Sequence, residues 1–87
     1  MKKLIKVEEV ESEGLLNFLG TRITLFCMNY IYTGELVGVN DKYVKLSDAK
    51  IVYETGPLDS GEWKDAQSLP DDLYVMTASV ESFMKLK

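Results

Sequence analysis

Residues 33–49, TGELVGVNDKYVKLSDA, hold the pattern that predicts the fold. Polar and apolar residues alternate on both sides of a short Asn-Asp turn, which is typical of two antiparallel strands joined in a hairpin. Gly34 and Gly38 share one face of the first strand. Glycine weakens a strand unless the strand must bend or another backbone comes close. The two glycines therefore predict a sharply curved strand, and the weaker alternation at residues 47–49 predicts a bend or bulge in the next one.

The same alternation predicts further strands on both sides of this hairpin. The interval between residues 54 and 73 holds both prolines and many acidic residues, so residues 56–72 are expected to form one long acidic loop. A tight connection is expected at Ala78 and Ser79. The five expected strands cover residues 21–27, 29–40, 42–54, 73–77 and 79–85.

Apolar residues between positions 7 and 19 recur at near-helical spacing and predict a short helix. Ser12 could act as its N-cap, in which case the helix begins there, and Gly20 would end it. The sequence thus predicts a mostly β protein with one domain, residues 1–87. A short N-terminal helix would precede a five-stranded, strongly bent antiparallel small barrel over residues 21–85.

The residue types present exclude several kinds of chemistry. The chain has one cysteine and no histidine, so it has no internal disulfide, no histidine-based catalytic triad and no zinc site with histidine ligands. It carries neither a phosphate-binding glycine loop nor a spaced acidic motif. Cys27 lies in an apolar stretch and is expected to be a small buried hydrophobe rather than a reactive thiol. We therefore expect a protein that is not an enzyme and that uses no metal or cofactor.

The charge of the chain is unevenly distributed. Residues 1–50 hold seven basic and seven acidic groups, whereas residues 51–87 hold three basic and seven acidic ones, so the net charge of −4 lies in the second segment. This balance does not favour duplex DNA as a partner, and an anionic ligand is expected to approach the first segment. No apolar run approaches the ~18 residues of a membrane span. We expect a cytoplasmic protein without a membrane partner.

The spacing of glycines and apolar residues resembles the first motif of the Sm-like proteins. That motif has a glycine before the first strand, then Gly-x-Leu-x-Gly, a turn, an apolar-x-Leu pair and Asp-Ala. The likeness extends over residues 12–83 and is strongest over residues 20–49. The matching residues are Gly20, Ile23, Leu25, Gly34, Leu36, Gly38, Val44, Leu46, Asp48 and Ala49.

This resemblance implies a closed homo-oligomeric ring of five to seven subunits. In Sm-like rings the fourth strand of one subunit pairs with the fifth strand of the next, which leaves no open sheet edge. A different possibility is that these two strands close one barrel. If the ring forms, the oligomer interface would contain Leu73, Tyr74, Val75, Met76, Val80 and Phe83.

The resemblance also implies binding of single-stranded RNA, with motifs that diverge from the family pattern. Asn40 or Asp41 takes the place of the family's aspartate, Lys42 that of its stacking residue, and Tyr43 that of its asparagine. Tyr43 would stack on a base, Lys42 would meet a phosphate and Asn40 would bond a base edge. In the second motif Met76 and Thr77 replace Arg-Gly, and the histidine motif of the bacterial branch is missing.

A second reading of the same ring is a structural or protein-interaction module that has lost RNA binding. Residues 40–43 would then form only a solvated hairpin turn, and the acidic loop 56–72 would carry the contacts. Trp63 lies in this loop, where it either packs the loop down or marks a partner surface.

Overall fold

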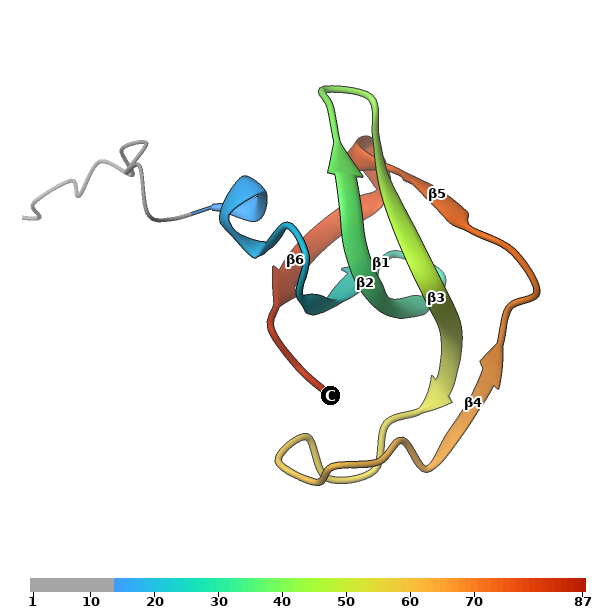
Figure 1. Ribbon diagram of the computed structural model, residues 1–87. Coiled ribbons are helices and arrows are strands. Elements are labelled where there is room, and N and C mark those ends of the chain that lie inside the picture. Colours follow the sequence, from blue (N-terminus) through green and yellow to red (C-terminus); the bar gives the residue numbers. More distant parts are fainter. Residues whose placement is uncertain (1–13) are drawn as a thin grey trace, which may run out of the picture.

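The computed structural model describes residues 14–87, and their six strands form one antiparallel sheet (Figure 1). Two short 3₁₀ helices accompany them, η1 (Leu15–Phe18) and η2 (Thr77–Ser79). Along the sheet the strand order is β4-β3-β2-β1-β6, and β5 pairs with β3. The strands are β1 (Arg22–Cys27), β2 (Ile31–Val39), β3 (Tyr43–Glu54), β4 (Asp65–Ser68), β5 (Leu73–Met76) and β6 (Val80–Met84).

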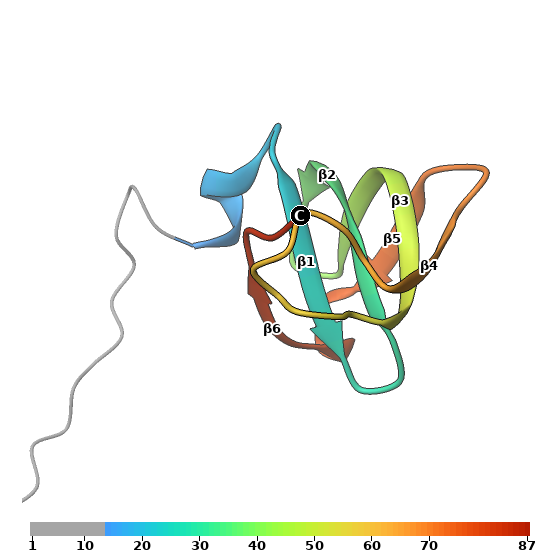
Figure 2. The ribbon, with the colours of Figure 1, turned by 90° about the horizontal axis from the view of Figure 1, so that it is seen from below.

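Strand β3 gives the sheet its curled shape. It has 12 residues, and its first half pairs with β5 while its second half pairs with β4. Figure 2 shows the strands curling around a common interior. Within residues 14–87, β5 and β6 are joined by η2 but are not paired with each other, so strand pairing does not close the sheet. The mostly β, antiparallel fold is confirmed, whereas the expected closed barrel is an open, curled sheet.

Two predictions about the elements were wrong. The loop expected over residues 56–72 contains a strand that was not expected, β4, whose mostly polar sequence DAQS gives no alternating pattern. Its strand conformation comes from pairing with β3, from Lys50↔Ser68 to Glu54↔Asp65. The helix expected over residues 7–19 lies partly outside the described residues. The described part is only the 3₁₀ turn η1, because Gly14 and Gly20 have φ of 95° and 84° and leave too few residues between them for an α-helix.

The bend predicted at residues 47–49 is confirmed as a β-bulge. Thr33 pairs with Lys50 and Glu35 pairs with Ser47, so Gly34 of β2 faces two residues of β3, Asp48 and Ala49. Asp48 has φ of 48°, a left-handed conformation that aspartate tolerates better than most residues. Arg22, the first residue of β1, binds the Asp48 carboxylate at 3.1 Å and donates to its carbonyl at 3.3 Å.

The core fills the inside of the curl. Its buried apolar side chains come from β1, β2, β3 and β5, and Thr24 and Thr33 are the buried polar residues among those described. The Thr33 hydroxyl donates to the Ile23 carbonyl and accepts from the Thr24 hydroxyl, so burial leaves neither group without a partner. The buried apolar residues are Ile23, Leu25, Leu36, Val44, Leu46, Ala49, Val52 and Val75.

Among residues 14–87, no helix has the length and apolar character required to cross a membrane.

Candidate functional site

The β2–β3 hairpin turn is held in one shape by Asn40. Its side-chain Oδ1 accepts hydrogen bonds from the backbone N–H groups of Lys42 and Tyr43, each at 2.8 Å. The Asn40 N–H in turn donates to the Tyr43 carbonyl at 3.0 Å. These two bonds within the turn use only the side-chain oxygen of Asn40 and not its amide N–H groups.

The hairpin turn is also tied to η2, the connection between β5 and β6. The Thr77 hydroxyl donates to the Asp41 carbonyl at 2.8 Å, and the Thr77 N–H donates to the Lys42 carbonyl at 2.9 Å. Residues 40–43 and 77–79, which are far apart in the sequence, therefore lie together at one end of the sheet. The expected tight turn at residues 78–79 is confirmed as η2.

Two tyrosines lie beside this turn. The rings of Tyr43 and Tyr74 form an edge-to-face pair with centroids 5.3 Å apart, and Tyr43 faces Met76 across the β3–β5 ladder. The Lys45 amino group lies 5.4 Å from the centre of the Tyr74 ring and 3.6 Å from the Asp72 carboxylate. Tyr74 and then Asp72 raise the pKa of Lys45 above its usual value.

Exposed aromatic rings beside ammonium groups suit a single-stranded nucleic acid, because bases stack on rings and phosphates pair with cations. Tyr43 is 38% exposed and Tyr74 is 54% exposed, so each ring presents surface to solvent. Lys42 and Asp41 are exposed on the turn itself. Of the four predicted RNA-binding residues, Asn40 shapes the turn, while Asp41, Lys42 and Tyr43 present side chains. Tyr74, which was expected at the oligomer interface, and Lys45, which the sequence pattern did not single out, lie beside Tyr43 and the turn.

The six predicted interface residues fall into two groups. Val75 is buried in the core, and Leu73 and Val80 pack against it. Tyr74, Met76 and Phe83 are exposed, with Met76 56% exposed, and they lie on the edge strands β5 and β6. Phe83 also makes an edge-to-face contact with Phe18. A cavity of about 320 Å³ lies beside β5 and is lined in part by Tyr30, Tyr32, Tyr74 and Met76.

The environment of the Cys27 thiol does not favour reactivity. Cys27 is half-buried at the end of β1 rather than fully buried as expected. Burial, and then the negative charge of Glu81, raise the pKa of the Cys27 thiol, which makes it a poor nucleophile at neutral pH. Within the described part of the chain, no group of three or more cysteine, aspartate or glutamate side chains is placed to hold a metal ion.

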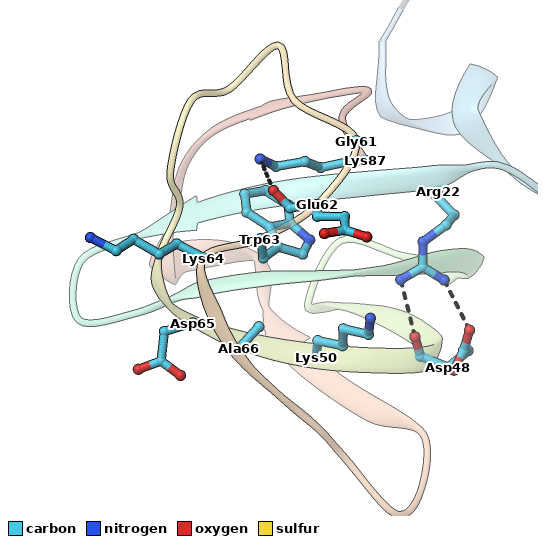
Figure 3. A pocket seen from close by; sticks show the side chains of 10 residues that line it. All are labelled: Arg22, Asp48, Lys50, Gly61, Glu62, Trp63, Lys64, Asp65, Ala66 and Lys87. Carbon is cyan, nitrogen blue, oxygen red and sulfur yellow. Dashed lines mark hydrogen bonds and ion pairs between the residues drawn. The ribbon is translucent and has the colours of Figure 1, made fainter.

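A second hollow lies near Trp63 and was not predicted. Arg22, Asp48, Lys50, Trp63 and Lys87 are among the residues that line this cavity of about 550 Å³ (Figure 3). Trp63 packs under the Lys87 amino group, which lies 4.5 Å from its ring centre. Of the two expected roles for Trp63, packing of the loop is the one that this contact supports. No local pattern links residues 63 and 87, so only the folded chain brings them together.

Comparisons with protein-family models, with curated proteins and with solved structures each found no match to this chain.

Proposed function

We propose that this chain is a self-assembling, Sm-like protein with a small curled β-sheet and that it binds single-stranded RNA at residues 40–43. The observation that carries the proposal is that β5 pairs only with β3 and β6 only with β1 within residues 14–87, so the outer edge of each strand is open. Unpaired edges are templates for another strand, and a ring in which β5 of one copy meets β6 of the next satisfies both.

The side chains on these two strands support assembly. Tyr74 and Met76 on β5 and Phe83 and Met84 on β6 are 38–56% exposed, although all four are large and apolar. Exposed apolar groups gathered along an open strand edge are typical of interaction surfaces. Pairing of the two strands between copies would cover these groups, and it would add stability to a chain of only 87 residues.

Single-stranded RNA is the ligand that best fits the hairpin end. Tyr43 offers an exposed ring surface for base stacking, and Lys42 beside it on the turn places positive charge there. In a ring, the copies of this weak site on several subunits would bind the same RNA molecule, and such multivalency raises the overall affinity. Metal and thiol chemistry contribute nothing to this proposal, which is for a binding protein rather than an enzyme.

A structural or protein-interaction ring is the second candidate function. It is favoured by Asn40, whose side-chain oxygen is already occupied by the turn, and by Met76, which stands where the family carries arginine. The net charge of −4 also opposes a polyanion. The loop over residues 56–72 would then make the contacts.

Native mass spectrometry of the protein, purified without nuclease, separates these possibilities. One closed oligomer carrying extra mass that ribonuclease removes is the expected result. A closed oligomer with the mass of protein alone would favour the interaction module. A monomer would contradict the ring and the resemblance on which it rests.

Replacing both Lys42 and Tyr43 by alanine should weaken RNA binding at least about tenfold, because base stacking alone contributes ~1–3 kcal/mol per base. The loss is measured by fluorescence anisotropy with a labelled oligouridine at several salt concentrations. The salt dependence of binding should also become shallower, since a phosphate contact is lost.

The matched control replaces Tyr53 and Lys85, another exposed tyrosine and another exposed lysine, by alanine. This control should bind the oligouridine as the unaltered protein does. Equal affinities for both double variants would contradict RNA binding at residues 40–43.

A further inference from the structure

The loop between β3 and β4 encloses the amino group of Lys87 on several sides. The Lys87 Nζ donates to the carbonyl oxygens of Thr55 at 3.1 Å, Pro57 at 2.8 Å and Glu62 at 2.5 Å. The same nitrogen lies 4.5 Å from the centre of the Trp63 ring, as Figure 3 shows for Lys87 above Trp63. An ammonium has three N–H donors, so these three carbonyls satisfy it completely while the ring faces its charge.

Each of these carbonyls also accepts a hydrogen bond from within the loop. The Thr55 carbonyl also accepts the Lys64 N–H at 3.3 Å, and the Pro57 carbonyl also accepts the Ser60 N–H at 3.1 Å. The Glu62 carbonyl accepts the Ser60 hydroxyl at 3.4 Å. Each carbonyl oxygen has two lone pairs, so one bond within the loop leaves one for a ligand.

The ends and the charge of the loop are suited to a cation. Gly56 has φ of 66°, which lets the chain turn between the first two carbonyls. Lys64 and Glu54 form an ion pair at 3.3 Å across the base of the loop, where β3 and β4 begin to pair. Residues 54–65 contain four acidic groups and one basic group, so the field around the loop attracts positive charge.

We propose that this loop is a binding site for a primary alkylammonium group, which the chain fills with its own Lys87 and which another amine occupies when Lys87 is withdrawn. Convergence of three carbonyls on one point fits a compact ammonium and not the planar fork of a guanidinium. Lys87 and Trp63 are both partly exposed, so exchange needs no opening of the core.

The proposal does not rest on RNA binding. Loop 55–64 and the hairpin turn 40–43 lie at opposite ends of the molecule in Figure 1. Two sources supply the required group, a lysine side chain of another polypeptide and a small polyamine. Both share the alkylammonium chemistry that the three carbonyls and Trp63 recognise.

The test titrates n-butylammonium, the end of a lysine side chain, into the full chain carrying Lys87→Ala. Trp63 is the only tryptophan, so its fluorescence reports the site directly. We expect a saturable change with a Kd on the order of millimolar, as suits so small a ligand. The unaltered protein should respond at least about tenfold more weakly, because its tethered Lys87 competes at a high effective concentration.

Tetramethylammonium is the chemical control, since it carries the charge but has no N–H donor. It should bind at least about tenfold more weakly than n-butylammonium, and equal binding would overturn the assignment of the three carbonyls. Two further titrations identify the source. Tighter binding of spermidine points to a polyamine, whereas tighter binding of a lysine peptide, abolished by Nε-acetylation, points to a polypeptide.

Lys85→Ala, on a neighbouring exposed lysine, should behave as the unaltered protein does. If circular dichroism shows that Lys87→Ala does not fold, the titration uses Lys87→Met, which keeps most of the apolar part of the side chain. If neither folds, recovery of the folded spectrum on adding n-butylammonium supports the proposal, and failure to recover overturns it. The proposal is overturned if a folded Lys87 variant shows no saturable fluorescence change with n-butylammonium. It is also overturned if the unaltered protein responds as strongly as that variant does.

Discussion

Replacing Gly34 by valine should lower the free energy of unfolding by about 3 kcal/mol, the upper range for overpacking of a filled interior. A Cβ at this position would lie 3.0 Å from the Ser47 carbonyl oxygen, 3.1 Å from the Leu46 Cβ and 3.2 Å from the Ala49 Cα. Two of these atoms belong to the backbone of the β3 bulge, so no side-chain rotation relieves the contact. The close approach of β2 to β3 at this point requires glycine.

Gly34→Ala tests the same contact with the smallest possible side chain and should cost about 1–3 kcal/mol. Gly38 provides the matched control on the same strand. A Cβ there would meet only the Lys45 Cβ, at an ordinary 3.6 Å, so Gly38→Ala should change stability by less than about 0.5 kcal/mol. Urea unfolding, followed by circular dichroism at one protein concentration, measures all three variants. Equal losses for Gly34→Ala and Gly38→Ala would contradict this account of the bulge.

The two glycines show how far the sequence predicts this fold. Their placement predicted a curved strand, and the weakened alternation before Ala49 predicted a bulge, which the structure has at Gly34 and Asp48. The sequence did not show that the glycines differ. Gly34 meets the facing backbone whereas Gly38 does not, and this depends on strand register, which is a property of the folded pair.

The elements that were mispredicted are those whose conformation is set by distant neighbours. Residues 65–68 form β4 because β3 continues past the bulge and offers an edge, although their own side chains give no strand pattern. The apolar spacing over residues 7–19 suggested a helix, but its described part lies between Gly14 and Gly20, and that interval is too short to form more than one 3₁₀ turn.

The candidate site was predictable only in part, for the same reason. The turn at residues 40–43 carries a local signature and was identified from the sequence. Its contact with Thr77 and the placement of Tyr74 beside Tyr43 arise from the β3–β5 pairing. Convergence of three carbonyls on Lys87 joins segments more than twenty residues apart and has no sequence signature.

In the proposed ring, replacing Met76 by proline should leave only monomers while each subunit stays folded. Thr77 pairs with Lys42 through its N–H, and hydrogen-bonded pairs alternate with non-hydrogen-bonded pairs along an antiparallel ladder. The N–H of Met76 therefore faces away from β3, toward the open edge of β5. Proline removes this donor and places its ring where an incoming strand would pair.

The backbone of Met76 is already suited to proline. Its φ is −66° and its ψ is 128°, close to the values that the proline ring imposes, and its side chain is 56% exposed. The preceding residue, Val75, is extended in β5, as a residue before proline prefers. The free energy of unfolding of the isolated Met76→Pro subunit should therefore lie within about 1 kcal/mol of that of the unaltered subunit.

Met76→Ala separates the backbone effect from the side-chain effect, because it removes the thioether and keeps the N–H. It should weaken assembly without abolishing it, whereas Met76→Pro should leave only monomer in light scattering coupled to size-exclusion chromatography. Circular dichroism confirms that each subunit is folded. A folded Met76→Pro variant that assembles like the unaltered protein would exclude the β5 edge as the interface, since strand pairing there requires the donor that proline lacks.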